Sequence, residues 1–413
     1  MRILLLSQWY PPEPMKFLSE MTETLQALGH EVTVLTGFPN WPSGKLHPGY
    51  RLRLWQREEQ NGIQIIRVPL FPDHSRSALK RALNFVSFAI SATVLGLWLS
   101  PRPDVMHVIH PPITIGLPAL VLSFLWRIPF TLEIQDMWPE TLRATGMIRR
   151  EAALRAVGAF AKLVYRRACA IRVISPGFRR NLIEKGVPAS KVRVISNWVD
   201  ADFYRPSQPD RDLAQKLGLE GCFTVMYAGT IGLAQGLDVV LDAAERLRDL
   251  PRMHFVLAGD GVEYERIRAE AESRNLANVR FLGRVPNEST PALYALADVL
   301  FLHLRNDPLF HITIPHKVFT YMASGKMVLA AMKGDVEELV RSSGCGVVCP
   351  PDDAEALASA IRDCYGLSPA GRAAFGENGR HAVCESYDRR QLVERVGAMM
   401  EQAARSPVTQ YPG

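Results

Sequence analysis

The sequence predicts an α/β protein made of two doubly wound domains, each a parallel sheet covered by helices on both faces. Its 413 residues are too many for one ordinary hydrophobic core and suit two domains of roughly 200 residues each. Short, continuous apolar segments alternate with longer segments of helical periodicity, which is typical of a parallel sheet buried on both faces. The alternation starts again after Ser196, so we expect a second sheet and a cleft between the two domains.

Each expected strand of the first half is a short, continuous apolar segment. The strands are expected at residues 3–8, 31–36, 65–70, 105–110, 130–135, 170–175 and 192–196, and helical patterns lie between them at 18–28, 83–99 and 114–126. The first apolar run contains four residues, fewer than the about 7 to 15 of a signal-peptide core. We therefore expect it to be a buried strand.

The second half repeats the pattern. Strands are expected at residues 223–229, 254–259, 279–283, 299–304, 327–331 and 346–350, with helices that include 237–247 and 263–275. The segment NWVDADFYRPSQPDRD between the halves is polar and contains two prolines, as linkers do. We therefore predict an N-terminal domain at 1–200, a C-terminal domain at 201–388, and a final helix within 389–413 that can return to the first domain.

Composition and charge narrow the class of protein. Apolar residues make up 47% of the chain and charged residues 22%, as in soluble globular enzymes. The net charge of +6 comes from dispersed Lys and Arg without interleaved aromatic residues, so we expect anionic ligands or lipid as partners and no nucleic acid. The six cysteines lack the spacing and the His partners of a zinc or redox site. We expect no metal, buried thiols and a reducing cytoplasm.

The helix expected at Leu83–Leu99 has two interpretations. Its 17 residues are near the lower limit of about 17 to 25 for a membrane-spanning helix, and we expect it not to span. Polar residues that include Asn84 and Ser91 recur at helical spacing and form a stripe. The helix therefore either packs in the core, which we favour, or lies in a membrane interface beside basic residues. In the second case Phe88 and Trp98 would enter the lipid.

A glycine-rich loop follows the strand at residues 223–229. Ligands of open α/β sheets bind at the carboxyl ends of the strands. Gly229, Gly232 and Gly236 precede a helix, so the backbone there can approach a bulky anion such as a diphosphate. The GxGxxG fingerprint of dinucleotide binding is absent from the sequence, which argues against a nicotinamide cofactor.

A second candidate for anion binding is the segment PLFHITIPHKVFTYMASGKM. His311, His316 and Lys317 lie just before a short apolar helix that ends at Gly325. The free N–H groups and the dipole at a helix N-terminus favour a negative charge, so positive side chains there suit a phosphorylated ligand.

These motifs, together with GFPNWPSGKLHPGY, HPPITIGLP, EIQDMWPE and SNWVD, resemble a bacterial branch of glycosyltransferase family four. The resemblance covers nearly the whole chain, and its branch includes fucosamine transferases of O-antigen and capsule assembly. It implies the GT-B fold, a nucleotide-sugar donor in the C-terminal domain and an acceptor in the N-terminal domain. Transfer in this family usually proceeds with retention of configuration and without a metal, and we expect no cofactor.

The resemblance also assigns donor residues. Lys317 would stabilise the charge that develops on the leaving diphosphate, and Arg284, in the loop FLGRVP, would lie nearest the nucleotide base. The residues expected to contact the donor are Gly229, Thr230, Gly232, Gln235, Arg284, Arg305, Asp307, His311, Thr313, Ile314, Pro315, His316 and Thr320.

The chain departs from the family pattern at the donor site. Two glutamates of the family, one near the sugar and one on the ribose, fall here on Ile312 and Thr320. A threonine hydroxyl can bond to ribose but gives up the stronger charge-assisted bond. Thr230 and Gln235 stand where relatives often have Arg and Lys. Donor binding is therefore expected to depend on backbone amides and on Lys317.

On the acceptor side, His110 ends the strand at 105–110 and is expected to face the reaction centre. His107, inside that strand, is expected to be structural. Asp136 and Glu140 follow the next strand and either orient or deprotonate the acceptor hydroxyl or serve at a helix N-terminus. Three further residues are expected near the acceptor: Glu13, Lys16 and Trp41.

The sequence thus predicts a retaining glycosyltransferase that extends a cell-surface glycan. The expected donor is a UDP-sugar, and the expected acceptor is carried on polyprenyl diphosphate at the cytoplasmic face of the inner membrane, where the enzyme would be peripheral. One alternative is a nucleotide-sugar epimerase of the same fold. Another is an inactive paralogue that binds glycan or protein, motivated by Thr320.

Overall fold

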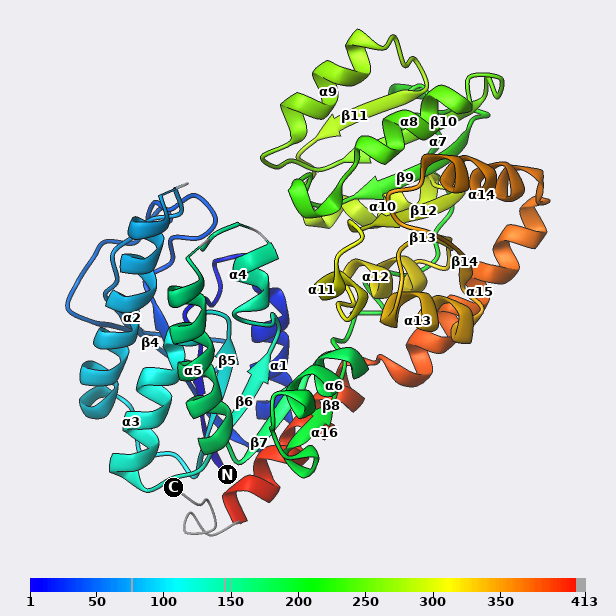
Figure 1. The fold of residues 1–413 in the computed structure, drawn as a ribbon. Helices are drawn as coiled ribbons and strands as arrows, with labels where there is room; N and C mark the ends of the chain where they lie inside the picture. Colours follow the sequence, from blue (N-terminus) through cyan, green and yellow to red (C-terminus); the bar gives the residue numbers. More distant parts are fainter. Residues whose placement is uncertain (76, 145, 149, 406–413) are drawn as a thin grey trace. The chain divides into compact units, whose positions relative to one another are not determined.

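The computed structural model describes residues 1–75, 77–144, 146–148 and 150–405. The chain divides into two compact units (Figure 1). The N-terminal unit comprises Met1–Ser196 and the C-terminal segment from Arg390, and the C-terminal unit comprises Asn197–Arg389. The boundary expected after residue 200 falls a few residues beyond this division.

The N-terminal unit is built on one eight-stranded sheet in the order β3-β4-β2-β1-β5-β6-β7-β8. All neighbouring strands are parallel except β3 and β4. The strands are β1 (Arg2–Leu6), β2 (Glu31–Gly37), β3 (Gln56–Gln60), β4 (Ile63–Val68), β5 (Val105–His110), β6 (Phe130–Ile134), β7 (Ala170–Val173) and β8 (Val192–Val194). The central strands β1, β5 and β6 are almost wholly buried, as expected for a sheet with both faces covered.

Strand β3 is absent from the expected set. Its sequence QREEQ is polar and mostly exposed, so it lacks the apolar pattern by which the other strands are found. It pairs antiparallel with β4 through a two-residue turn in which Asn61 and Gly62 have φ angles of 53° and 78°. Asn-Gly is the preferred sequence for such a hairpin turn, and this dipeptide is the signal from which β3 could have been found.

Helices cover both faces of this sheet. They are α1 (Lys16–Ala27), α2 (Ala78–Leu99), α3 (Gly116–Trp126), α4 (Glu140–Ala144), α5 (Glu151–Arg167), α6 (Pro176–Glu184) and α16 (Arg389–Arg405), with short 3-10 turns η1 (Ile113–Ile115) and η2 (Ala189–Lys191). In Figure 1, α2, α3 and α5 form one layer of this unit. α1 contributes Leu18, Met21 and Leu25 to the core.

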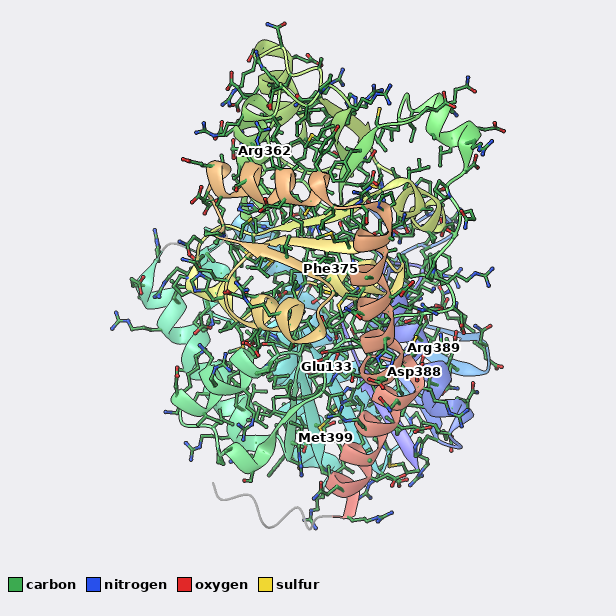
Figure 2. All side chains as sticks on the ribbon, turned by 90° about the vertical axis from the view of Figure 1, so that its right-hand side faces the viewer. Glu133, Arg362, Phe375, Asp388, Arg389 and Met399 are labelled. Carbon is green, nitrogen blue, oxygen red and sulfur yellow. The ribbon has the colours of Figure 1, made fainter. Side chains whose placement is uncertain are left out.

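α16 lies against the N-terminal unit although it ends the described chain. It follows α15 (Pro369–Ser386) after Tyr387 and Asp388, begins at Arg389 and carries Met399 (Figure 2). Gly397 lies beside Leu25 and His30, and Arg395 donates a hydrogen bond of 3.2 Å to the carbonyl of Val194. Its inner face buries apolar residues that include Leu392, Val396 and Met400.

A buried charge network joins the central strands β5, β6 and β7. The Glu133 carboxylate accepts hydrogen bonds from Arg172 at 2.5 Å, from His107 at 3.1 Å and from Gln135 at 2.5 Å. Burial alone would raise the pKa of Glu133, but the Arg172 guanidinium and His107 outweigh burial and lower this pKa to about 2. His107, whose other ring nitrogen lies 2.8 Å from Thr131 Oγ1, is therefore a structural residue of the sheet, in agreement with the prediction.

The C-terminal unit has a second, six-stranded sheet in the order β11-β10-β9-β12-β13-β14, and all of its strands are parallel. They are β9 (Phe223–Ala228), β10 (Met253–Ala258), β11 (Val279–Gly283), β12 (Val299–His303), β13 (Met327–Ala331) and β14 (Gly346–Cys349). The covering helices are α7 (Arg211–Lys216), α8 (Asp238–Arg246), α9 (Tyr264–Ser273), α10 (Thr290–Leu296), α11 (Pro308–His311), α12 (Lys317–Ala323), α13 (Asp335–Ser343), α14 (Ala354–Gly366) and α15. The prediction of two doubly wound domains is confirmed.

Helix α2 presents its polar stripe to the protein and much of its apolar surface to the outside. Asn84 is 2% exposed, accepts a hydrogen bond from Gln8 at 2.6 Å and donates one to the carbonyl of Phe71 at 2.7 Å. Ser91 donates to the carbonyl of Pro69. Phe88 lies in the core, fully buried, which agrees with the favoured interpretation of a core-packed helix for this residue. The polar side chains face inward because they satisfy backbone groups of the loops that follow the strands.

Candidate functional site

In the C-terminal sheet the strand order reverses between β9 and β12. From β9 the chain proceeds outward to β10 and β11, and then returns to the other side of β9 with β12. Such a switch point opens a crevice at the carboxyl ends of the two strands, where α/β proteins bind ligands. The glycine-rich loop follows β9, and the segment with the histidines follows β12, so the two predicted anion-binding segments meet at this crevice.

The loop after β9 is held by close backbone approach. The N–H of Gly229 donates to the carbonyl of Ala258, and the N–H of Ile231 donates to the carbonyl of Asp260. A Cβ atom at Gly259 would collide with the carbonyl of Gly229, which explains the glycine at that position. The Gly229 amide is thus engaged within the protein in this conformation, and the expected contact of this loop with a diphosphate stays a prediction. Gly229 has a φ of 143°, which favours glycine, and leaves room for a neighbouring side chain.

The turn that follows, η3 (Leu233–Gln235), is held in place by a side chain of β12. His303 binds the carbonyl of Gln235 at 2.6 Å and accepts from the N–H of Asp352 at 3.0 Å, which requires a neutral ring with its proton on Nδ1. Burial lowers the pKa of His303, in keeping with that neutral form. His303 was missed from sequence because its role depends on two loops distant in the chain.

Arg305 and Gln235 also form hydrogen bonds with this loop. Arg305 donates from Nε to the carbonyl of Leu233 at 2.9 Å and pairs with Asp238 at 3.0 Å. Gln235 accepts the N–H of Gly232 through its side-chain oxygen at 3.1 Å. These contacts shape the loop, and the expected donor contacts of Arg305, Gln235 and Gly232 stay predictions. Thr230 remains exposed at its tip.

Lys317, the first residue of α12, reaches the same loop. Its Nζ lies 2.7 Å from the hydroxyl of Tyr227 and 3.9 Å from the centre of that ring. The hydroxyl of Tyr227 in turn donates to the carbonyl of Thr230 at 2.6 Å. A Cβ at Gly229 would lie 2.6 Å from this Nζ, so glycine makes room for the ammonium group.

The electrostatic state of Lys317 suits an anionic ligand. No carboxylate of the described residues pairs with its ammonium group, and burial lowers the pKa of Lys317 to about 7. Lys317 is half-buried, and a cation partly removed from water gains from an arriving anion. Tyr227 was missed from sequence, although a tyrosine inside a buried strand requires a polar partner for its hydroxyl and therefore marks a polar site.

The side chains between β12 and α12 do not converge on this ammonium group. Asp307 caps α11 by accepting the N–H of Leu309 at 2.8 Å. His311 contacts Asn306 Oδ1 at 2.8 Å, and His316 contacts the carbonyl of Trp198 at 2.8 Å. The hydroxyl of Thr313 donates to the carbonyl of Leu309 at 2.8 Å. Ile314 is 7% exposed and lies in the core, and the carbonyl of Pro315 accepts the N–H of Val318. The expectation that two histidines and a lysine aim together at a helix N-terminus is therefore wrong.

Thr320 lies inside the core of the C-terminal unit. It is 4% exposed, and its hydroxyl donates to the carbonyl of Lys317 one turn earlier at 2.9 Å. The hydroxyl is thus engaged within its own helix in this conformation, and the expected ribose contact of Thr320 stays a prediction.

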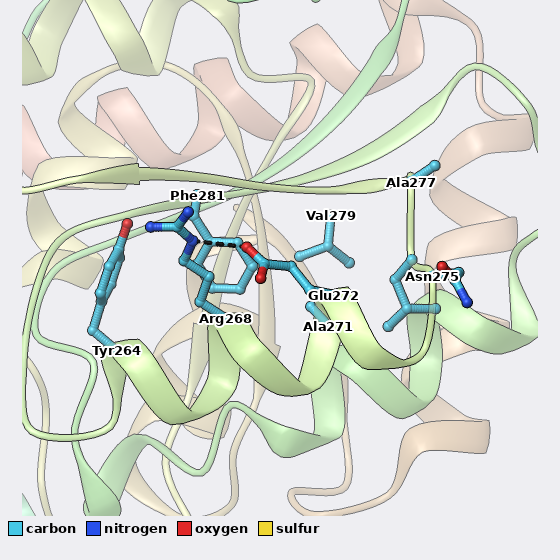
Figure 3. Close-up of a pocket in the computed structure, with 9 residues that line it drawn as sticks. Tyr264, Arg268, Ala271, Glu272, Asn275, Ala277, Val279 and Phe281 are labelled. Atoms are coloured by element: carbon cyan, nitrogen blue, oxygen red, sulfur yellow. Dashed lines mark hydrogen bonds and ion pairs between the residues drawn. The ribbon is translucent and has the colours of Figure 1, made fainter.

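Arg284 is exposed in the loop after β11. The outer edge of the sheet next to this loop is hollowed between α9 and β11 (Figure 3). Tyr264 lies at one end of the hollow and Ala277 at the other, and an ion pair of 3.0 Å between Arg268 and Glu272 bridges the helix face. The hollow follows the length of α9, so it is distinct from the crevice between β9 and β12.

In the N-terminal sheet the order reverses between β1 and β5. His110 ends β5, is fully buried, and neither of its ring nitrogens has a hydrogen-bond partner among the described residues. Burial lowers the pKa of His110 to about 3, so the imidazole is neutral at physiological pH. An unpartnered buried polar side chain is costly, and His110 is therefore a strong candidate for contact with a ligand.

An aromatic row leads to His110. Trp41 and Trp9 are separated by 6.4 Å between ring centres, Trp9 and Phe85 by 6.3 Å, Phe85 and Trp138 by 6.0 Å, and Trp138 and His110 by 5.6 Å. The rings come from the loops after β1, β2 and β6 and from α2. Trp41 was expected at this mouth, whereas the other rings were missed because distant segments bring them together.

The acidic residues near this row have different roles. Asp136 follows β6, and burial raises the pKa of Asp136 to about 6. Glu140 begins α4 and pairs with Lys185 at 2.5 Å. Asp136 therefore remains available as an acid or base, while Glu140 is engaged in an ion pair.

Glu13 holds two loops together. Its carboxylate accepts backbone N–H groups from Tyr10 at 3.0 Å, Asn40 at 2.9 Å and Trp41 at 2.8 Å, and the side chain is 2% exposed. Its expected contact with the acceptor is replaced by a positioning role for Trp41. Lys16 is exposed and lies 3.4 Å from Glu20.

Comparison with known proteins gives concordant matches over both units. The model of the glycosyl transferase 4-like domain matches residues 15–198, and that of glycosyl transferases group 1 matches residues 210–382. The chain is 29% identical over 375 residues to WcaI of Escherichia coli K12, a colanic acid biosynthesis glycosyl transferase by name. This match covers 88% of this chain and 91% of that protein. It is 25% identical over 252 residues to WbjE of Pseudomonas aeruginosa, a glycosyltransferase by name, at 60% and 62% coverage.

Solved structures share the fold. The structure of Anabaena HepE in complex with UDP superposes with a TM-score of 0.75 at 19% identity and covers 97% of this chain and all of that one. WaaG, described as a glycosyltransferase involved in lipopolysaccharide biosynthesis, superposes with a TM-score of 0.66 at 17% identity, with 97% and 99% coverage. Both agree with the two-sheet architecture described above.

Proposed function

The chain belongs to the family-four glycosyltransferases of the GT-B type, and from that premise we propose that it transfers a sugar from a UDP-sugar to a lipid-linked glycan acceptor. The C-terminal unit would hold the donor and the N-terminal unit the acceptor. Retention of configuration and independence from metals and other cofactors belong to the proposal. The observation that carries it is the ammonium group of Lys317 beside Gly229 at the switch point, which no carboxylate in the described part of the chain pairs with.

Lys317 would act on the leaving group. When the bond between the anomeric carbon and the diphosphate oxygen breaks, negative charge grows on that oxygen. A nearby ammonium group stabilises the charge more in the transition state than in the ground state, which is the condition for a gain in turnover. The loop held by His303 and Arg305 would place the diphosphate, and the hydroxyl of Tyr227 would position Nζ.

The acceptor would enter along the aromatic row. Aromatic faces suit both the apolar faces of sugar rings and a prenyl chain, because each presents a large apolar area. His110 would give or accept a hydrogen bond as a neutral ring, since its pKa of about 3 makes it a poor base. Asp136, with a pKa near 6, would be ionised at pH 7 and able to take the proton of the acceptor hydroxyl as the new glycosidic bond forms.

The names of relatives support a lipid-linked acceptor. A Streptococcus pneumoniae protein 33% identical over 161 residues is named alpha-galactosylglucosyldiacylglycerol synthase, and that match covers 36% of this chain. Its named product is a glycolipid, and WcaI is named for colanic acid biosynthesis. We therefore propose a polyprenyl-diphosphate-linked glycan of a surface polysaccharide, such as an O-antigen or capsule, as the acceptor, and a peripheral location at the cytoplasmic face of the inner membrane.

Transfer is tested with purified full-length chain, pooled UDP-sugars and polyprenyl-diphosphate-linked glycans from the cytoplasmic membrane. The expected result is one added sugar on the acceptor and one UDP released per transfer. A change in the UDP-sugar without release of UDP would indicate the epimerase alternative. The named relatives above are transferases or a synthase, so no observation favours that alternative.

Donor binding is expected to depend on pH through Lys317. Its pKa of about 7 lies well below the usual 10.5, and a bound diphosphate would raise it. Above pH 7 binding must therefore take up a proton, and UDP affinity is expected to fall by up to about tenfold per pH unit between about pH 7 and 9. Calorimetry in two buffers of different ionisation enthalpy measures this uptake, which is expected to approach one proton at about pH 8.5.

The matched control is Lys317→Met, which keeps an unbranched side chain and removes the charge. It is expected to bind UDP more weakly and to show no proton uptake above pH 7. Equal proton uptake by this variant and the unmodified chain would contradict the assignment of Lys317 to the diphosphate.

A further inference from the structure

Helix α2 carries a continuous apolar stripe on its outer face. Large side chains recur every three or four residues along its whole length and are 44% to 80% exposed: Leu79, Leu83, Val86, Ile90, Val94 and Trp98. Among the described residues, α2 is the one helix whose length and composition would allow it to cross a membrane, but its inner face is bound to the sheet. The stripe is therefore a surface feature of a packed helix.

The apolar surface extends beyond α2 on two sides. α3, which lies beside α2 (Figure 1), exposes Phe124 by 77% and Leu125 by 51%. At the C-terminal end of α2, Arg57 donates a hydrogen bond to the carbonyl of Leu99 at 2.7 Å, and its guanidinium lies 5.7 Å from the ring centre of Trp55. This contact brings the exposed loop Leu52–Trp55 next to the C-terminal end of α2. We call the stripe with these two extensions the α2 face.

Basic residues border the α2 face. The segment from residue 74 to 132 contains a single acid, Asp104, which pairs with Arg2 at 2.9 Å. The same segment contains Lys80 near the start of α2, Arg102 just after its end and Arg127 at the end of α3. Arg51 and Arg53 alternate with the apolar residues of the loop before β3. An apolar centre with a positive border matches an interface of acyl chains and anionic headgroups.

We propose that the α2 face docks the enzyme on a bilayer that contains anionic lipid, with α2 parallel to the membrane plane. This inference rests on the proposed function, because it names the surface through which an enzyme of a lipid-linked acceptor meets its substrate. A second copy of the chain fits less well, because a two-fold contact through this face would bring the positive borders together. Phe85, in the aromatic row, belongs to α2, so the docking helix also supplies a ring of the acceptor row.

The test is co-sedimentation of the full-length chain with vesicles of phosphatidylcholine alone or with phosphatidylglycerol added. We expect binding to the anionic vesicles that weakens as salt is raised, and at least a tenfold loss of binding in the triple variant V86S, I90S and V94S. Trp98→Ser, at a site 80% exposed, is expected to weaken binding by itself. Val262→Ser, at an apolar site of the C-terminal unit that is 64% exposed, is the matched control and is expected to bind as the unmodified chain does.

One further variant, with two substitutions, keeps the proposal open to contradiction if the triple variant unfolds. Lys80→Gln combined with Arg102→Gln leaves the apolar stripe intact and is expected to lose the preference for anionic vesicles. Absence of vesicle binding by the unmodified chain would overturn the proposal, as would a dimer in light scattering that the triple variant dissociates. A thermal shift with UDP is measured in parallel. A UDP shift without vesicle binding contradicts only the α2 face, whereas vesicle binding without a UDP shift contradicts only the proposed function.

Discussion

Replacement of Lys317 by alanine is expected to lower the turnover number by on the order of 100-fold or more, because one charge-stabilising donor is lost at the leaving diphosphate. The folded structure is expected to persist. Burial of this ammonium group disfavours its charged form, as its lowered pKa shows, so loss of the charge does not by itself cost electrostatic stability near pH 7. The measurement is release of UDP at saturating donor and acceptor.

Two further variants are controls for Lys317→Ala. Lys317→Arg retains the charge and is expected to recover part of the turnover, limited by the larger guanidinium beside Gly229. Lys216→Ala changes an exposed lysine of α7 and is expected to leave turnover unchanged. Turnover by Lys317→Ala equal to that of the Lys216 variant would contradict the role of Lys317.

Replacement of Glu133 by alanine is expected to destabilise the N-terminal unit by about 3 to 5 kcal/mol, because it leaves the buried Arg172 guanidinium without its counter-charge. The pKa of Glu133 is lowered to about 2, so its contribution is present above the usual carboxylate range near pH 4.5 and is lost as the pH falls toward 2. The destabilisation is therefore measured near pH 7, by urea unfolding followed by circular dichroism.

The double variant Glu133→Leu with Arg172→Met is the control for that experiment. It removes both charges, so it is expected to lose less stability than Glu133→Ala, since no buried charge remains unpaired. A single variant within about 1 kcal/mol of the unmodified chain would show that water or a rearranged partner compensates Arg172.

Most of the fold could be predicted from the sequence because its strands are continuous apolar segments. In both sheets these segments coincide with observed strands, and β3 is the exception because it is a polar edge strand. The inward orientation of the polar side of α2 could not be predicted. It depends on hydrogen bonds from Asn84 and Ser91 to loops far away in the sequence.

The position of the candidate site could be predicted from the sequence, but the roles of its individual residues could not. The carboxyl ends of β9 and β12 carry the predicted loops, and Lys317 and His110 lie at the two switch points. Arg305, Asp307 and Thr320 have the residue types of a donor site, yet their hydrogen bonds serve the loop or the helix in which they lie. A sequence shows which polar groups are present, whereas their partners are set by tertiary contacts.

The most direct test of the central claim is mass spectrometry of the acceptor after incubation with the purified full-length chain and pooled UDP-sugars. We expect a polyprenyl-diphosphate-linked glycan heavier by one sugar, with an equal amount of UDP released and the reaction largely lost in Lys317→Ala. An acceptor of unchanged mass, in the presence of a UDP-sugar that raises the melting temperature of the protein, would contradict the claim.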